Sequence, residues 1–200
     1  MFADEEKFSD DMKREFAKNH VALRPYTEIE NAVGKLSGRK KMLIDPERLS
    51  YALYKLIPDE TEMIEKENPE IIMKSVKNDI ETEHIRRAHL KDAAAHTKFI
   101  YWLKENIGKT EITERSASAR LEEFRKEQDG YLGPSFEPIS AYYEHGAIVH
   151  YSASKESDAR LEKGHFLLTD TGGHYKDGST DITRTVALGE VSYQEKEDFT

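Results

Sequence analysis

The sequence has 200 residues, with 30 Lys and Arg against 39 Asp and Glu and a formal net charge of −9. This acidic balance argues against a nucleic-acid partner, because such proteins usually present a basic surface. The chain has no cysteine, which excludes disulfide scaffolds and Cys-ligated zinc and is compatible with a cytoplasmic protein. No apolar run approaches the roughly 18 residues of a membrane span, and the acidic N-terminus lacks a signal-peptide pattern. We therefore expect no membrane partner.

The first part of the chain alternates helix and strand patterns. Residues 4–18 carry apolar side chains four residues apart, which predicts an amphipathic helix. Residues 40–57 begin with a short apolar strand, and Asp45-Pro46 then indicates a helix start with proline at the favoured first position. Residues 61–64 predict a second strand. Strand, helix and strand in this order indicate part of an α/β domain.

A second domain is predicted from residue 78, so that the expected division is 1–77 and 78–200. A capping box at its start predicts a long helix over residues 78–106. A second helix is predicted over 113–128. Beyond Gly130 the pattern becomes strand-like, with Gly and Pro punctuation. Helices followed by strands indicate an α+β fold class.

The chemistry concentrates in residues 165–189, HFLLTDTGGHYKDGSTDITRTVALG. Strand-like flanks and central glycines predict a hairpin about Tyr175-Lys176, with Asp170 and Asp181 opposite each other. Opposed residues in an antiparallel pair have Cβ atoms roughly 5 Å apart. Two carboxylates that close repel unless a cation lies between them. The hairpin therefore indicates a site for one or two metal ions.

Two other interpretations of the hairpin stay open on the residues alone. One is a surface hairpin with solvated acids, which the depletion of Asp in strand interiors weakens. The other is an aspartic protease, because Asp170 begins an Asp-Thr-Gly sequence, but that chemistry needs a second such aspartate. A metal site in turn needs more ligands than two aspartates. Upstream, His150 lies in the strand-like run 147–151, where a lone histidine is more often structural.

The hairpin resembles the metal-binding hairpin of the creatinase/aminopeptidase P family, the pita-bread metallopeptidases. That family carries Asp-Ser-Gly-Gly-x-Tyr-x-Asp-Gly-Thr-Thr-Asp-x-Thr-Arg-Thr, and this chain reads DTGGHYKDGSTDITRT, departing at Thr171 and Ser179. GAIVHYSA is similar to the family's substrate-binding histidine strand. The resemblance covers nearly all of residues 40–200. It implies the N-terminal half of a pita-bread fold, preceded by the C-terminal part of a creatinase N-terminal-like α/β domain.

The resemblance also implies roles for individual residues. Asp170 is similar to the aspartate that binds one metal in bidentate fashion, and Asp181 to the one that bridges two. His150 is similar to the histidine near the scissile bond. The implied cofactors are two divalent metal ions, most often manganese, with cobalt or zinc as substitutes. The family's remaining His and two Glu ligands lie C-terminal of the hairpin, beyond Thr200, so we expect a truncated, inactive chain that binds metal weakly.

The activity implied is that of an Xaa-Pro aminopeptidase. A metal-bridging hydroxide would attack the peptide bond before proline, releasing the N-terminal residue from a proline-containing peptide. The alternatives are an Xaa-Pro dipeptidase (prolidase) and a non-catalytic pita-bread interaction module. Exposed sheet edges in half a fold also lead us to expect a homo-oligomer.

Overall fold

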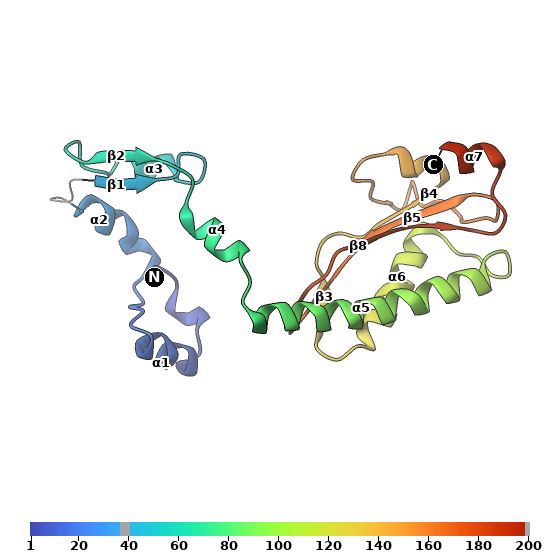
Figure 1. Ribbon diagram of the computed structural model, residues 1–200, viewed down its shortest axis with the longest axis horizontal. Helices are drawn as coiled ribbons and strands as arrows, with labels where there is room; N and C mark the ends of the chain where they lie inside the picture. The colour runs from blue at the N-terminus through green and yellow to red at the C-terminus, as the bar shows by residue number, and fades with distance from the viewer. Residues whose placement is uncertain (37–40, 199–200) are drawn as a thin grey trace. The chain divides into compact units, whose positions relative to one another are not determined.

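The computed structural model describes residues 1–36 and 41–198, and the chain divides into two compact units, Met1–Val76 and Lys77–Thr200. Each unit has its own arrangement of helices and strands (Figure 1). Among the residues described, no helix is both long and apolar enough to cross a bilayer.

The first unit contains short helices and a two-stranded parallel sheet. Strand β1 (Lys41–Ile44) pairs with β2 (Glu62–Glu65), in register from Lys41 opposite Glu62 to Ile44 opposite Glu65. This confirms the two predicted strands. The helical elements of this unit are η1 (Glu5–Lys7), α1 (Asp10–Lys18), η2 (Tyr26–Glu28), α2 (Ile29–Gly34), α3 (Tyr51–Tyr54) and α4 (Pro69–Ser75).

Two predicted helices of this unit begin later than expected. The helix predicted from residue 4 starts as α1 after Ser9, whose hydroxyl accepts the Met12 amide at 3.3 Å. The helix predicted from Asp45-Pro46 is wrong over its first turns, because the Asp45 carboxylate accepts the Glu47 amide at 3.1 Å and closes a turn instead. Only α3, after Ser50, is helical there.

The second unit opens with the two predicted helices. Helix α5 (Asp79–Asn106) begins at a capping box in which Asn78 and Glu81 exchange side-chain and backbone hydrogen bonds. Helix α6 (Glu114–Lys126) begins at a second capping box, formed by Thr113 and Ser116. A last helix, α7 (Tyr193–Asp198), is also capped by a side chain, because the Ser192 hydroxyl accepts the Glu195 amide. These caps lie in the sequence itself, which is why helix starts were predictable.

Strands follow the helices, as the α+β prediction requires. The main sheet has the order β4-β5-β8, all antiparallel, and a second small sheet has the order β3-β6-β7. The bounds are β3 (Tyr131–Pro134), β4 (Ile139–Tyr142), β5 (Phe166–Thr171), β6 (Gly173–Tyr175), β7 (Gly178–Ser179) and β8 (Ile182–Ala187), with η3 (Tyr143–Ala147) after β4.

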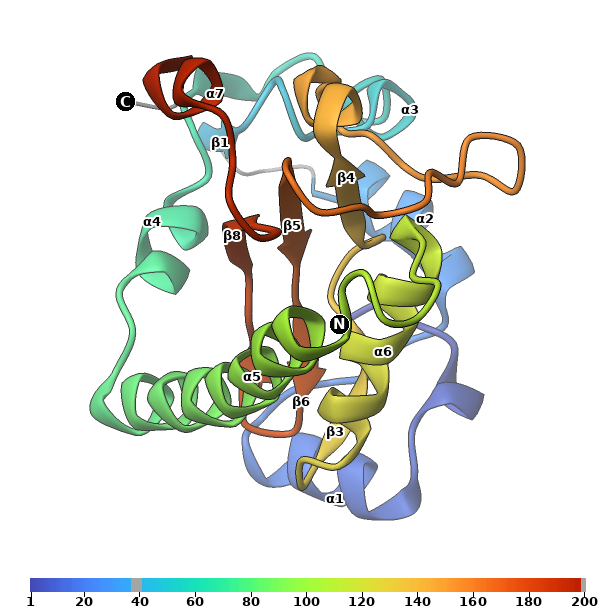
Figure 2. The same cartoon turned by 90° about the vertical axis from the view of Figure 1, so that its right-hand side faces the viewer.

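Helices α5 and α6 lie on one face of the main sheet (Figures 1 and 2). Along β5 the side chains alternate, so that Leu167, Thr169 and Thr171 are buried and Phe166, Leu168 and Asp170 are half-buried. Leu167 belongs to the core that α5 and α6 share with the sheet. The face that carries Asp170 therefore points away from the helices.

Candidate metal site

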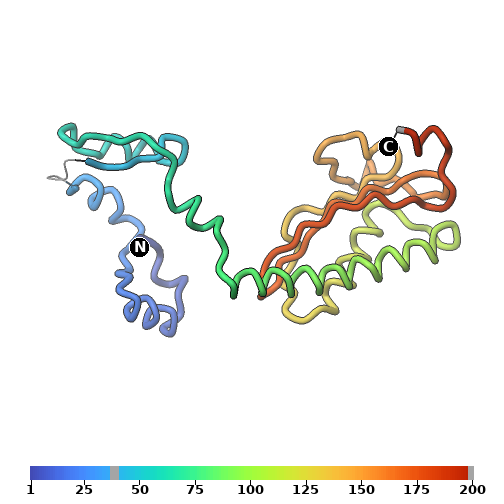
Figure 3. The backbone as a smooth tube through the Cα atoms, viewed as in Figure 1, coloured from blue at the N-terminus to red at the C-terminus, as the bar shows by residue number. Residues whose placement is uncertain are grey.

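The hairpin turns one residue later than the sequence predicted. Strands β6 and β7 pair Tyr175 with Gly178 around a loop of Lys176 and Asp177. The same register continues into β5 and β8, where Asp170 lies opposite Thr183. The expectation that Asp170 and Asp181 lie directly opposite each other is therefore wrong. Figure 3 shows the chain from β5 to β8 as one long hairpin.

The new register nevertheless keeps both carboxylates on one face. Asp181 is two residues from Thr183, so strand alternation places it on the side of Asp170, as a diagonal neighbour. Diagonal neighbours have Cα atoms roughly 7–8 Å apart in a regular ladder. Asp170 is half-buried and Asp181 exposed. Extended by one residue beyond β8, this alternation assigns both acids to the face that the helices leave open.

Neither carboxylate forms an ion pair with another residue in the described part of the chain. Asp170 Oδ1 accepts the Thr183 hydroxyl at 2.8 Å. The neighbouring cation, Arg184, instead donates to the Thr183 carbonyl at 2.7 Å. Two acids on one face without a cationic partner form an oxygen-rich, negative donor set, which suits a hard divalent ion.

The tip of the hairpin is fixed to α5 by charge. Lys91 Nζ lies 2.5 Å from Asp177 Oδ2 and also donates to the Asp129 carbonyl at 3.0 Å. The hydrogen bond from Lys91 holds the pKa of Asp177 below its usual range. An ion pair between residues 86 positions apart thus attaches the turn of the hairpin to α5.

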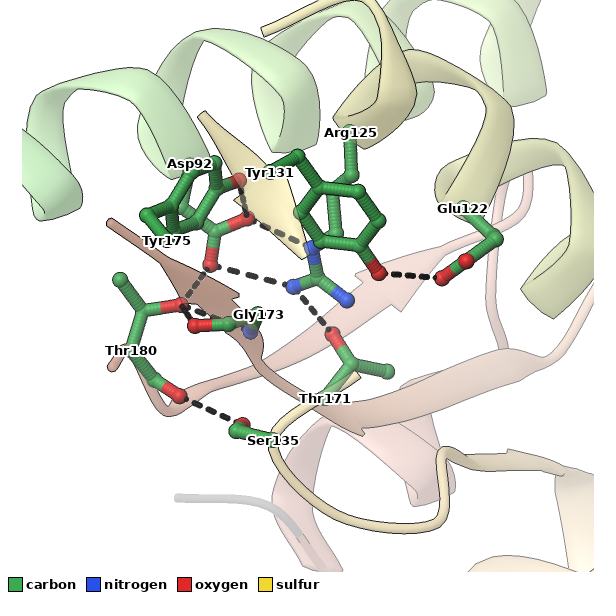
Figure 4. A network of polar contacts seen from close by, with 9 residues as sticks. All are labelled: Asp92, Glu122, Arg125, Tyr131, Ser135, Thr171, Gly173, Tyr175 and Thr180. Carbon is green, nitrogen blue, oxygen red and sulfur yellow. Dashed lines mark hydrogen bonds and ion pairs between the residues drawn. The ribbon is translucent and has the colours of Figure 1, made fainter. Parts of the chain in front are cut away.

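Behind the hairpin lies a buried polar network (Figure 4). Asp92 of α5 and Arg125 of α6 form a two-point ion pair, with Nε to Oδ1 at 2.6 Å and Nη2 to Oδ2 at 3.1 Å. Thr171, Tyr175 and Thr180 complete the network from the hairpin. Burial raises the pKa of the Tyr175 hydroxyl, which therefore stays protonated and donates to Asp92.

The sequence prediction missed Asp92 and Arg125. A signal was present for Asp92, because it occupies a helical position among the apolar residues Ala88, Ala95 and Phe99, all of which are buried. A charged residue on such a stripe is rarely buried without a partner. The partner itself, 33 residues away, was not visible in any local pattern.

His96 is the one histidine of α5 that the core encloses. It is 4% exposed, and its Nε2 has no hydrogen-bond partner in the described part of the chain. Burial, with a smaller contribution from Arg125, lowers its pKa from 6.5 to about 4. His96 is therefore neutral near pH 7.

His150 does not lie in a strand, which corrects the prediction for residues 147–151. It is exposed, in a turn after η3, with φ of 55° in the left-handed region. The run is not buried as a strand would be, since Ile148 is 53% and Val149 83% exposed. The structure does not bring His150 into hydrogen-bond contact with either aspartate.

The segment around His150 is held from both ends by Glu114. This carboxylate is 0% exposed; its Oε1 lies 2.8 Å from His145 Nδ1, and its Oε2 accepts the Tyr151 hydroxyl at 2.8 Å. Backbone amides of Tyr142 and Ala159 add two further hydrogen bonds. Because both ends of the run bond to one side chain, the residues between them form a turn and cannot extend.

The open face of the sheet contains a hollow of about 450 Å³. Its lining residues are mostly apolar, and they come from β4, η3, β5, β8 and α7: Ala141, Tyr143, Glu144, Gly146, Ala147, Phe166, Leu168, Thr185 and Glu195. Leu168 and Phe166 lie on the same face of β5 as Asp170. The candidate metal ligands therefore adjoin an apolar hollow large enough for amino-acid side chains.

Asp170 and Asp181 fit a metal centre as part of its ligand set. Within residues 1–36 and 41–198, no group of three or more His, Asp or Glu side chains surrounds a metal position. Two carboxylates are too few for two ions, so further ligands would have to come from outside these residues. Oxygen donors alone do not select among manganese, cobalt and zinc.

This α+β domain presents two aspartates on a β-hairpin, and neither forms an ion pair within the part of the chain that the structure describes. The chain belongs to metallopeptidase family M24, whose sequence profile matches residues 83–200. The Creatinase/Prolidase N-terminal domain profile matches residues 1–81. The predicted family is confirmed. The predicted fold is confirmed with it: part of a creatinase-like N-terminal domain, followed in the sequence by part of a pita-bread domain.

Among similar proteins, Xaa-Pro aminopeptidase 2 of Sus scrofa is 39% identical over 181 residues, covering 90% of this chain and 27% of its own length. Xaa-Pro aminopeptidase 1 of Dictyostelium discoideum is 35% identical, and the match covers 100% of this chain and 32% of that protein. The structure of X-prolyl aminopeptidase from Caenorhabditis elegans, a cytosolic enzyme with a di-nuclear active site, matches at a TM-score of 0.87 and 30% identity, covering 96% of this chain and 32% of that one. The chain thus spans about a third or less of these relatives.

Proposed function

We propose that the protein is a metal-dependent Xaa-Pro aminopeptidase that releases the N-terminal residue from peptides with proline in second position. The observation that carries this proposal is the pair Asp170 and Asp181, which share one face of a hairpin and have no cationic partner among residues 1–36 and 41–198. Relatives that are named Xaa-Pro aminopeptidases support the choice of reaction.

In this proposal Asp170 and Asp181 hold two divalent ions together with ligands from outside residues 1–200. Manganese is the proposed metal. When bound, such ions lower the pKa of water to give a nucleophile and stabilise charge on the carbonyl oxygen. Thr183 orients Asp170 through its hydrogen bond. His150, on an exposed turn, donates to the substrate, and the apolar hollow beside Leu168 receives substrate side chains.

The test is a peptide-release assay on the whole gene product that contains these 200 residues. With added Mn²⁺, we expect release of the first residue from a peptide whose second residue is proline, and loss of release with a chelator. A peptide that differs only in having alanine second serves as control and should be cut far more slowly. Equal rates on the two peptides, or no release at all, would overturn the proposal.

A second candidate is an Xaa-Pro dipeptidase. The Xaa-Pro dipeptidase of Bacillus anthracis matches the fold at a TM-score of 0.73 with 25% identity. The length of the peptide substrate distinguishes the two activities, because a dipeptidase cuts Xaa-Pro dipeptides but not longer peptides. We also propose a cytoplasmic location, as for the C. elegans enzyme, and a homo-oligomeric state, which light scattering would test. A non-catalytic interaction module would bind peptide without cutting it.

A further inference from the structure

We propose that Asp92 and Arg125 are positioning residues that set the spacing of the metal-binding aspartates before any metal arrives. The inference rests on the proposed function, because it concerns the same site. Both residues come from helices, α5 and α6, and neither contacts Asp170 or Asp181 directly. Their effect passes through the two threonines that adjoin the aspartates in the chain.

Each candidate ligand has a buried threonine as its immediate neighbour. Thr171 follows Asp170 and is 1% exposed, and Thr180 precedes Asp181 and is 3% exposed. Because neighbouring side chains of an extended chain point to opposite faces, a threonine that points inward sends the adjacent aspartate outward. The position of each threonine therefore sets the position of one carboxylate.

The two threonines are bonded to a single ion pair. Arg125 Nη2 donates to Thr171 Oγ1 at 3.0 Å, and Thr180 Oγ1 donates to Asp92 Oδ2 at 2.5 Å (Figure 4). The same Nη2 atom also donates to Asp92 Oδ2 at 3.1 Å. The chain between the two threonines forms the tip of the hairpin, so its two arms are tied together across the interior by side chains of two helices.

Both members of this ion pair are buried and multiply hydrogen-bonded. The carboxylate of Asp92 is 0% exposed and accepts four hydrogen bonds: two from Arg125, one from Tyr175 at 3.2 Å and one from Thr180. Arg125 is 1% exposed. Charge-assisted hydrogen bonds in a water-free interior are short and directional. The network therefore fixes both arms of the hairpin in one arrangement.

A rigid arrangement matters for a metal pair because each ligand must lie within a few tenths of an ångström of its place. Groups that orient ligands from behind usually contribute a factor of about 10–100 in metal affinity. Within the described ranges, Asp170 receives one side-chain hydrogen bond, from Thr183, and Asp181 lies outside the strands. Their placement depends on the arms that carry them, and hence on Asp92 and Arg125.

The chain offers a matched control in Thr169. It lies on the same strand and face as Thr171, has the same 1% exposure and also adjoins Asp170. Its hydroxyl, however, donates to the Arg184 carbonyl at 3.2 Å and not to the ion pair. Thr169→Val thus removes a buried hydroxyl next to the same ligand without touching the network.

The experiment measures Mn²⁺ affinity by calorimetry in the whole gene product, together with unfolding by urea. We expect Thr171→Val and Thr180→Val to weaken Mn²⁺ binding by at least about tenfold, and Thr169→Val by less than about twofold. Thr171→Ser and Thr180→Ser keep the hydroxyl and should restore binding. Tyr175→Phe, which removes one donor to Asp92 far from either ligand, should weaken binding by a smaller factor and covers the case in which a valine variant does not fold.

Two failures are distinguishable. If the unaltered protein takes up no Mn²⁺, the proposed function is wrong and this inference falls with it. If the unaltered protein binds Mn²⁺ but Thr171→Val, Thr180→Val and Tyr175→Phe bind it as tightly as Thr169→Val, the proposed function stands. The Asp92–Arg125 pair is then only a stabilising element of the fold.

Discussion

The Thr183 hydroxyl donates to Oδ1 of Asp170 at 2.8 Å across the β5–β8 ladder. It occupies the place directly opposite Asp170 that the sequence had assigned to Asp181. One oxygen of Asp170 is thereby oriented by a neutral donor, and the other has no hydrogen-bond partner among the residues that the structure describes. Thr183 is therefore a supporting residue of the candidate site.

Replacing Thr183 with valine should weaken metal binding and leave the fold intact. The change removes the hydroxyl that orients Asp170 and keeps the shape of an exposed strand residue. We expect a decrease of about tenfold in Mn²⁺ affinity, measured by calorimetry in the whole gene product. Thr185→Val, on the same face of β8, is the control. Equal affinity in both variants would show that this hydrogen bond does not matter for the metal.

Gly172 should tolerate no side chain. A Cβ built at this position would overlap the Thr180 carbonyl and the Ser135 hydroxyl, which are hydrogen-bonded to each other at 2.8 Å. Overpacking of this kind costs about 1–3 kcal/mol, so Gly172→Ala should lower the free energy of unfolding by at least that amount in urea titrations. Gly146→Ala, where a Cβ meets nothing within 4 Å, should be neutral. Similar stability of the two variants would contradict the packing described.

Stability should fall as the pH drops below 6.5, and His96 should account for part of this. Its native pKa of about 4 lies below the unfolded value of 6.5, so between these values the unfolded chain binds more protons. The contribution is complete above pH 6.5 and is lost toward pH 4, at up to about 1.4 kcal/mol per pH unit.

The measurement is the free energy of unfolding at several pH values, for the unaltered protein and for His96→Gln. Asp92, Arg125 and Arg184 are the charged groups that act on His96 and are kept unchanged. The variant should show a shallower slope below pH 6.5. His84→Gln, at a half-buried position nearer the start of α5, should keep the original slope. Identical slopes for the unaltered protein and His96→Gln would contradict the assignment.

Residues 1–200 produced alone should bind Mn²⁺ weakly and show no peptidase activity. The reason is the ligand count, because Asp170 and Asp181 cannot complete a two-ion centre. Calorimetry with Mn²⁺ should detect no tight two-ion binding. A submicromolar site for two ions in these 200 residues would contradict this expectation, because it would mean that residues 1–200 supply the further metal ligands themselves.

Much of the second unit was predictable because its signals are local. The capping boxes at Asn78 and Thr113 lie within four residues of each helix start, and the alternation along β5 lies within the strand itself. The hairpin turn was predicted one residue too early. The turn packs against distant parts of the chain, as the Lys91–Asp177 ion pair between residues 86 positions apart illustrates, and no local pattern shows such contacts.

The candidate site was predictable in its residues and less so in its geometry. Asp170 and Asp181 stand out because aspartate is rare in strands, yet their register depends on packing against α5. The strand predicted around His150 failed because Glu114, a residue distant in sequence, holds both of its ends. The Asp92–Arg125 pair was not predicted from the sequence, because its two members lie on different helices.

The most direct test of the account is the amount of metal bound by the whole gene product when Asp170 or Asp181 is replaced by alanine. We expect two tightly bound Mn²⁺ ions per unaltered chain and a loss of tight binding in Asp170→Ala and Asp181→Ala. Asp177→Ala, an aspartate of the same hairpin that pairs with Lys91, should keep the ions. If Asp170→Ala and Asp181→Ala bind the same amount of metal with the same affinity as the unaltered protein, the metal does not lie on this hairpin.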